Sequence, residues 1–343
     1  MNIRSIAKEA NVSPATVSLV LNSKPGVNKD TRARVTKLLI ENGYQIRAST
    51  SKQYNTKELL FLRFKSDSSR LESRDDFLVQ IMEGAEAQAT DYGYRLSFSS
   101  VERHTLPEIL ATAAQNYAGI IVFGTELDEQ DAAILSQASI PLSVTDASFP
   151  LYPIHTVSIN NYGAIYHALR YLNEMGHTQI GYLHSTVQSG EIPDRMMAYR
   201  NAMQLLQLEQ DPRFVYSLDP FLNLAYQQMC ATLNQNPELP TAFIADNDML
   251  ALGAMQAFQQ NGYRVPDDIS LIGFDDSHMS GMSSPPLTTI RVPKQMMGRV
   301  AVRQIKYLLD EPDDCEIYKT QICAEIVERR SVMRSLHFVD MQK

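Results

Sequence analysis

The sequence predicts an α/β protein with an N-terminal all-α helix-turn-helix headpiece and a core of two lobes, each a doubly wound parallel sheet. Three observations lead to this fold class. The chain has 343 residues, which is too many for one compact core. A short helical segment with a tight turn lies at the start of the chain. Most of the remainder alternates short apolar runs with segments of helical periodicity.

The opening segment has the pattern of two short helices. Apolar residues at helical spacing predict a first helix from Ile3 to Ala10, and Asn11 interrupts the pattern. Ser13 followed by Pro14 is typical of an N-cap and a first helical position. So tight a turn between two helices predicts a helix-turn-helix, whose second helix lies in the major groove of DNA.

The second helix separates apolar from small residues. Val17, Val20 and Leu21 fall on one face. The other faces carry Ala15, Thr16, Ser18, Leu19 and Asn22, and small polar side chains there can approach DNA closely. A third helix is predicted from its N-cap Asn28 to Gly43, which completes a minimal three-helix core.

Charge is distributed unevenly along the chain. The net charge is −8, which by itself argues against nucleic-acid binding. Residues 1–58 nevertheless carry 10 basic and 4 acidic side chains, a net +6, and the rest of the chain carries −14. A small basic head on an acidic body predicts a phosphate-contacting module, with a solvated basic helical face as the alternative.

Several classes of protein find no support in the sequence. No apolar run approaches the roughly 18 residues that cross a bilayer, and the charged N-terminus does not resemble a secretory signal, so we expect a cytoplasmic protein. The three cysteines and the scattered histidines predict neither disulfides nor a metal site, and we expect no cofactor. No nucleotide-binding loop, nucleophile elbow or zinc-protease helix is present, so we do not expect an enzyme.

The core is predicted from repeated β-α units. Apolar runs suited to buried strands lie at Leu59–Phe64, Leu96–Ser100, Gly119–Phe123, Ile140–Val144, Thr156–Ile159, Ile180–Leu183, Ala242–Ala245 and Ile269–Phe274. Helical periodicity lies at Phe77–Tyr92, Gly163–Met175, Arg195–Leu206, Leu224–Leu233, Met249–Asn261 and Met296–Leu309. In such lobes ligands bind at the carboxyl ends of the strands.

Six segments carry a resemblance to a known family. IAKEANVSPATVSLVLN and VNKDTRARVTKLLIENGY resemble the DNA-binding headpiece of the lactose-repressor (LacI/GalR) family. Four further segments resemble blocks of the same family and follow the family's order: VSINNYGAIYHALRYLNEMGHTQIGYL, RMMAYRNAM, PTAFIADNDMLALGAMQAF and VPDDISLIGFDDSHMSGMSSPPLTTIRVP. The resemblance covers nearly the whole chain. It implies a periplasmic-binding-protein-like core whose cleft holds an effector, commonly a sugar or another small polar metabolite.

With this resemblance the chain divides into three predicted parts. Residues 1–45 form the headpiece, 46–58 a hinge or linker, and 59–343 the effector-binding and dimerisation core. Within the core, the first lobe takes about 59–160 plus 277–310, and the second lobe about 161–276 plus 311–343.

The DNA-binding residues are expected in the headpiece and the hinge. They are Ser13, Pro14, Ala15, Thr16, Ser18, Leu19, Asn22, Asn28, Arg32, Tyr44 and Tyr54. Leu19 departs from the family, in which many members place arginine there to read guanine. Leucine offers only an apolar contact, for example to a thymine methyl, or packs partly buried; both interpretations stay open.

The hinge is a second departure. In the family, paired leucines open a central minor-groove step of the operator. Residues 45–57 contain no leucine, which leaves Tyr54, Gln53 or a less bent operator as alternatives. The Ser, Thr, Lys and Asn content of this segment, taken without the family, predicts a flexible linker.

The resemblance places the effector contacts at three positions of the second lobe. These are Arg195, Asn247 at the end of one predicted strand, and Asp275 at the end of another. A guanidinium and a carboxylate that face each other can bracket vicinal hydroxyls, because hydroxyls both donate and accept hydrogen bonds. Further candidates are Asp75, Phe77 and Asp146 in the first lobe, and Phe221, which offers a face to a sugar ring or belongs to the core. Asp248 is a candidate helix cap and Asp276 a candidate turn residue.

Together these features predict a sequence-specific transcriptional regulator. We expect a repressor of a carbohydrate-utilisation operon that binds a pseudo-palindromic DNA operator as a homodimer, does not associate with membranes, and is controlled by a small-molecule effector, a sugar by first choice. Helices near Phe77–Tyr92 and Met249–Asn261 are expected to contribute to dimerisation. The alternatives are a solute-binding protein without a regulatory role and a regulator controlled by a protein or a non-sugar corepressor.

Overall fold

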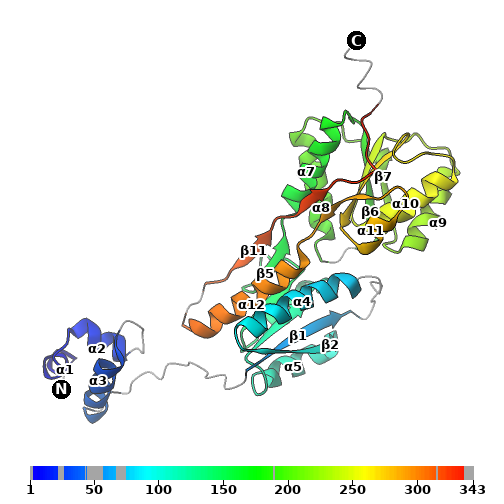
Figure 1. Ribbon diagram of the computed structural model, residues 1–343. Coiled ribbons are helices and arrows are strands. Elements are labelled where there is room, and N and C mark those ends of the chain that lie inside the picture. Colours follow the sequence, from blue (N-terminus) through cyan, green and yellow to red (C-terminus); the bar gives the residue numbers. More distant parts are fainter. Residues whose placement is uncertain are drawn as a thin grey trace. The chain divides into compact units, whose positions relative to one another are not determined.

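The computed structural model describes residues 3–21, 27–42, 44, 57–66, 75–187, 190–313 and 316–335 (Figure 1). The chain separates into two compact units. One comprises Met1–Tyr54 with Asp310–Cys315, and the other comprises Asn55–Leu309 with Glu316–Lys343. The helices of the first unit form the headpiece, and the second unit is the core.

The headpiece is built from three helices, α1 (Ile3–Glu9), α2 (Pro14–Leu21) and α3 (Lys29–Glu41). The predicted caps are present: the backbone N–H of Thr16 donates to Ser13 Oγ (3.1 Å), and that of Thr31 donates to Asn28 Oδ1 (2.8 Å). The helices enclose one small apolar cluster, made of Ile6, Ala7, Ala10, Val17, Val20, Val35 and Leu39.

The first lobe contains a six-stranded sheet whose described strand pairs are all parallel, in the order β11-β5-β4-β3-β1-β2. Its strands are β1 (Glu58–Lys65), β2 (Arg95–Glu102), β3 (Gly119–Phe123), β4 (Leu142–Thr145), β5 (His155–Ile159) and β11 (Lys319–Ile322). Its helices are α4 (Asp75–Asp91), α5 (Leu106–Ala113), α6 (Glu129–Leu135) and α12 (Lys294–Asp310), with a short 3-10 turn η2 (Arg103–Thr105). Helices α4 and α12 approach closely, because a Cβ built on Gly298 would lie 1.9 Å from the carbonyl oxygen of Ile81.

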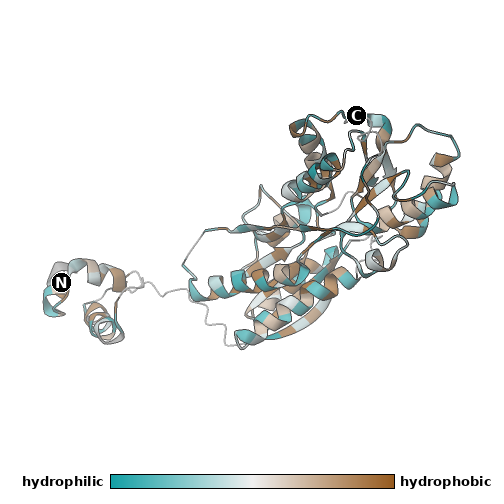
Figure 2. Cartoon of the chain, turned by 45° about the horizontal axis from the view of Figure 1, so that its top comes forward, coloured by the Kyte–Doolittle hydropathy of each residue, from teal (hydrophilic) through white to brown (hydrophobic). Residues whose placement is uncertain are grey.

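The second lobe contains a six-stranded sheet with the strand order β12-β10-β9-β8-β6-β7. Its strands are β6 (Ile180–Ser185), β7 (Val215–Leu218), β8 (Ala242–Ala245), β9 (Ser270–Asp275), β10 (Thr288–Arg291) and β12 (Glu325–Val327), of which only β12 runs antiparallel to its neighbour. Its helices are α7 (Asn161–Glu174), α8 (Ile192–Leu205), α9 (Leu222–Leu233), α10 (Asp248–Gln260) and α11 (His278–Met282), with the 3-10 turn η3 (Pro212–Phe214). Figure 2 shows hydrophobic residues along the strands and mixed faces on the helices that cover them.

The α/β class and the two parallel lobes are as predicted, but the predicted lobe boundaries after residue 276 are wrong. Strand β10 was assigned to the first lobe, yet it pairs with β9 in the second sheet. Strand β11 was assigned to the second lobe, yet it pairs with β5 in the first sheet. Both strands are short, β10 is half threonine and β11 is half-exposed, so no apolar run marks either of them. Along the described residues, the chain therefore passes between lobes after β5, after β10 and after β11.

Candidate functional site

Helix α2 presents its small residues to solvent. Ser13, Pro14, Ala15 and Ser18 are exposed, Thr16 and Leu19 are half-buried, and Val17 and Val20 are buried. The Thr16 and Ser13 hydroxyls lie 2.9 Å apart. The contact between Ser13 and Thr16 therefore fixes the start of this exposed face within the first turn of the helix. The half-buried state of Leu19 agrees with both of its predicted roles.

The other predicted DNA contacts flank this helix or lie beyond it. Asn28 caps α3, and Arg32 and Tyr44 are half-buried. Asn22 and Tyr54 lie outside the described residues, as does most of the predicted hinge. Exposed Lys8, Arg34 and Lys37 add positive charge to the headpiece surface, which suits contact with phosphates.

Arg195 is the centre of the predicted effector site in the core. It lies on α8 and is only 1% exposed. Its Nε donates to Asn161 Oδ1 (3.1 Å), and its Nη1 donates to the main-chain carbonyl of Asp246. The guanidinium carbon lies 3.7 Å from the centroid of the Phe274 ring, and Nη2 lies 4.0 Å from Asp275 Oδ1. Three different strand-end segments thus fix the orientation of one guanidinium.

Asp275 ends β9 with an unusual backbone. Its φ of 107° lies in a region that favours glycine, which is a strain more common at functional sites than elsewhere. Its main-chain carbonyl accepts a hydrogen bond from Lys294 Nζ, which comes from the first lobe, and this ammonium also lies 5.5 Å from the centroid of the Phe77 ring. Asp275 therefore links Arg195 to the opposite lobe.

Asp246 is a site residue that sequence reasoning missed. It follows β8 and is fully buried. Its carboxylate accepts hydrogen bonds from the Tyr182 hydroxyl, from His184 Nδ1 (2.7 Å) and from the backbone N–H of Ser185 (2.6 Å). The signal that could have indicated it is its place at the carboxyl end of a buried strand, directly before the predicted contact Asn247.

The two neighbours of Asp246 in sequence have structural partners as well. Asn247 is the N-cap of α10, because its Oδ1 accepts from the backbone N–H of Leu250 (2.9 Å). The prediction that Asp248 caps this helix is therefore wrong. Asp248 instead accepts from Thr289 Oγ1 (2.5 Å) and from the backbone N–H of Ser277 (2.6 Å). Burial and the charge of nearby Asp275 raise the pKa of Asp248 to about 7.

Asp276 has a positive φ of 52°, which suits the predicted turn, and it is also ion-paired. Its carboxylate accepts from Arg291 Nε at 2.7 Å and from Arg329. Burial raises the pKa of Asp276, but these two guanidinium partners outweigh burial and hold the pKa below its ordinary value. These two ion pairs connect the end of β9 to β10 and to the segment after β12.

The first-lobe candidates lie at strand and helix ends. Asp146 follows β4 with a φ of 60°, is 2% exposed, and accepts a hydrogen bond from the Thr125 hydroxyl. Phe77 is buried in the first turns of α4, with its ring centroid 6.4 Å from that of Phe123. Asp75 begins α4, and its side chain lies outside the described residues.

The contacts join most of the predicted core residues into one set. From the first lobe come Phe77 and Lys294, and from the second come Asp275, Arg195 and Asn247 next to Asp246. Phe221 stands apart from this set: it is half-buried at the N-cap of α9, and no contact described here connects it to Arg195.

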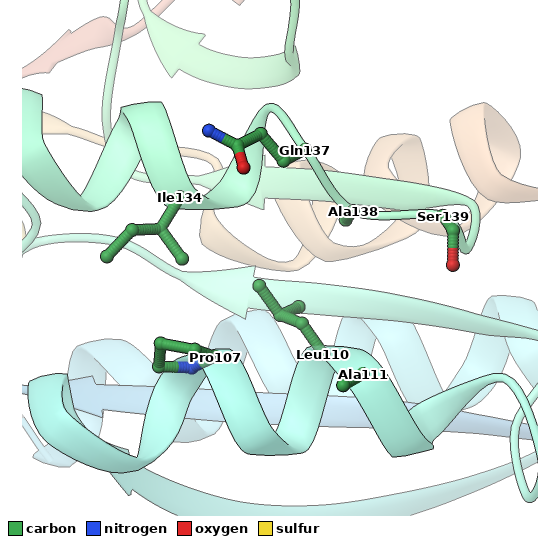
Figure 3. A pocket seen from close by; sticks show the side chains of 7 residues that line it. All are labelled: Pro107, Leu110, Ala111, Ile134, Gln137, Ala138 and Ser139. Carbon is green, nitrogen blue, oxygen red and sulfur yellow. The ribbon is translucent and has the colours of Figure 1, made fainter.

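Two cavities of the core lie away from these residues. One of about 210 Å³ lies between α5 and α6, where Leu110 and Ile134 point toward each other (Figure 3). The other, of about 310 Å³, is bordered by α9, α10 and α11 and includes Met279 and Met282 in its lining. Neither contains a predicted effector residue.

Comparison with known proteins gives two matching family models. Residues 2–46 match the bacterial regulatory proteins of the lacI family, and residues 169–332 match a periplasmic binding protein-like domain. The "HTH-type transcriptional repressor PurR" of Aliivibrio salmonicida is 31% identical over 341 residues, which are 96% of this chain and 98% of that protein. The chain belongs to the lacI family of regulators. The predicted family, fold and general role as a DNA-binding transcriptional regulator are confirmed.

Other members of the family are similar over most of their length. The "HTH-type transcriptional repressor CytR" of Escherichia coli (strain K12) is 30% identical, covering 88% of this chain and 87% of that protein. Among solved structures, the lac repressor dimer bound to operator and the anti-inducer ONPF is 26% identical with a TM-score of 0.70, covering 97% of this chain and 99% of that one. The CelR–cellobiose complex, at 23% identity and a TM-score of 0.70, shows a common fold.

Two searches of the described residues bear on other classes of protein. None of the helices there has the length and apolarity needed to span a bilayer. Nor do three or more His, Cys, Asp or Glu side chains of that part of the chain group in a way that could hold a metal ion.

Proposed function

We propose that this regulator is a repressor that binds a pseudo-palindromic operator as a homodimer, and that a small polar molecule held between the lobes of the core controls its DNA affinity. A sugar is the first candidate for this effector. The proposed parts are the headpiece at 1–45, the hinge at 46–58 and the core at 59–343. Because the ligand is chromosomal DNA, the same proposal puts the protein in the cytoplasm.

The observation that carries the proposal is the pairing of Arg195 with Asp275. The two side chains come from α8 and the end of β9 and lie 4.0 Å apart at the carboxyl edge of the second sheet, where ligands bind in α/β lobes. A guanidinium has five N–H donors, and the contacts described for Arg195 leave donors for a ligand. Facing donors and acceptors of this kind match neighbouring hydroxyls of a sugar.

The relatives support both halves of the proposal. PurR and CytR are named as repressors, the lac repressor structure is a dimer on its operator, and the CelR structure holds cellobiose. A solute-binding protein without a regulatory role is disfavoured by the headpiece, with its exposed small residues on α2 and its basic surface. Control by a protein or a non-sugar corepressor differs only in what occupies the core.

Two measurements on the full chain test the proposal. Selection from random DNA should recover a two-fold symmetric site. A thermal-shift screen against sugars, sugar phosphates, nucleobases and amino acids should give a dose-dependent rise in melting midpoint with one sugar. This rise should be absent in Arg195→Ala and retained in Arg213→Ala, whose side chain is 67% exposed on the same lobe. If only a non-sugar raises the melting midpoint, that compound replaces the sugar as the proposed effector. Failure to recover any DNA site would refute the operator-binding role.

A further inference from the structure

Two buried carboxyl groups, one from each lobe, lie close to the contact between the lobes. Asp146 follows β4 of the first lobe and is 2% exposed, and Glu191 directly precedes α8 of the second lobe and is 4% exposed. The backbones are close here, because a Cβ built on Gly190 would lie 3.0 Å from the Thr125 carbonyl oxygen and 3.3 Å from that of Asp146. The segment before α8 thus rests on the carboxyl edge of the first sheet.

Glu191 also holds one of the segments that connect the lobes. Its Oε1 accepts from the backbone N–H of Ile159 (2.9 Å), and its Oε2 accepts from Asn161 Nδ2 (2.9 Å). Ile159 is the last residue of β5 and Asn161 the first of α7, so these two residues span the first passage between the lobes. A single side chain therefore fixes both ends of that passage.

The charged groups around Glu191 come from both lobes. Asp146 faces it from the first lobe, Arg195 lies one turn further along its own helix, and Asn161 contributes a neutral amide from α7. Burial and the negative charge of Asp146 raise the pKa of Glu191 to about 8, against the opposing effects of Arg195 and of the two hydrogen bonds. Near neutral pH the pair holds a proton, whereas two ionised carboxylates would repel each other in a buried site.

We propose that Asp146 and Glu191 form a proton-dependent latch between the lobes: the protonated pair holds the first passage closed, and loss of the proton separates the lobes at this edge. The latch follows from contacts within the free chain, so it does not depend on the effector or on operator binding. In a regulator whose lobes move relative to each other, it would make the resting position of the lobes sensitive to pH.

Hydrogen exchange on the full chain, without DNA or effector, tests the latch. Exchange in segments 155–165 and 190–196 is followed by mass spectrometry from about pH 6.5 to about pH 9.5, with times scaled for intrinsic amide chemistry. In the wild type we expect exchange to rise about tenfold for each pH unit below the pKa of Glu191, because the closed state there holds one proton that the opened state has lost. Above that pKa both states are ionised, so exchange should level off.

Variants on the two sides of the latch sharpen this test. Glu191→Gln puts a neutral group that cannot ionise at this position, so it should abolish the pH dependence of both segments. Asp146→Asn removes the repelling charge but leaves Glu191 buried, so the pH at which exchange levels off should fall. Glu209→Gln removes an exposed carboxylate of the same lobe and should behave as the wild type.

Three results would overturn the latch. The first is pH-independent protection in the wild type, and the second is wild-type pH dependence in both folded variants. The third is an equal rise of exchange in α9 and α10, which would indicate global destabilisation. Should a variant not fold, infrared difference spectra of the wild type decide the question. A protonated-carboxyl band that disappears over the same pH range is expected, and the absence of that band at neutral pH would refute the proposal.

Discussion

The headpiece and the core place their candidate functional residues in opposite environments. On α2 the residues that would meet DNA are exposed or half-buried, and the contact between Ser13 and Thr16 spans three positions of sequence. In the core, Arg195 and Asp246 are almost completely buried, and their hydrogen-bond partners lie 34 to 64 positions away along the chain. The candidate DNA-reading residues are thus separable from folding, whereas the candidate effector residues are themselves part of the fold.

The largest effect is expected at Asp246. Asp246→Ala leaves the Tyr182 hydroxyl, His184 and the Ser185 N–H without their buried acceptor. We expect a loss of about 3–5 kcal/mol in the free energy of unfolding of the core, measured by urea denaturation and circular dichroism. Asp267→Ala, at an exposed position of the same lobe, is the control and should change stability by less than about 0.5 kcal/mol. Equal effects of the two substitutions would remove the contrast between buried and exposed sites.

A substitution in the apolar cluster of the headpiece should be nearly as destabilising, but only for the headpiece. Leu39 is fully buried, and its neighbour Ile40 is 62% exposed. Leu39→Ala should destabilise the headpiece by about 2–5 kcal/mol and abolish operator binding, with the calorimetric transition of the core unchanged. Ile40→Ala should bind the operator like the wild type. A matching shift of the core transition in Leu39→Ala would show that the two units do not fold independently.

A substitution on the reading face should change specificity without changing stability. Leu19→Arg introduces a bidentate donor for guanine, so we expect one position of each half-site to change preference toward a G·C pair by about 1–3 kcal/mol. Competition among operators that differ at single positions measures this preference. A loss of thermal stability with unchanged base preference would instead assign Leu19 to the apolar cluster of the headpiece.

The smallest effect concerns pH. Because burial and Asp275 raise the pKa of Asp248 to about 7, the folded state binds a proton more tightly than the unfolded chain does. The resulting stabilisation is complete below the ordinary pKa of 3.8 and is lost as the pH rises through about 7. We expect the free energy of unfolding to fall by the order of 1 kcal/mol between about pH 5 and about pH 7.5, and Asp248→Asn to flatten that slope. A rise over this range, or the same slope in Asp248→Asn, would contradict the assignment.

The sequence predicted the elements that have a local signature. Helix α2 was marked by Ser13 and Pro14, and buried strands such as β3 were marked by continuous apolar runs. Strands β10 and β11 were assigned to the wrong lobes, because their pairing depends on partners far away in sequence and their residues are largely polar. Local pattern therefore identifies an element more readily than it identifies its sheet.

The same limit applies to the site. Arg195 and Asp275 were found through resemblance to family blocks, and the structure brings them to 4.0 Å. Asp246 and Glu191 were missed because their importance depends on tertiary contacts, with His184 in one case and Asn161 in the other. The cap of α10 was assigned to Asp248 instead of Asn247, since both residue types favour that position and only the geometry separates them.

The central claim is that a ligand at Arg195 in the core controls DNA binding by the headpiece. Fluorescence anisotropy with the selected operator, with and without the ligand found by thermal shift, tests it directly on the full chain. The wild type should change its operator affinity by roughly 5- to 150-fold on ligand addition. Folded Arg195→Ala should bind the operator with unchanged affinity and show no response to the ligand. A full response in Arg195→Ala, or equal loss of operator affinity and response in that folded variant, would contradict the account.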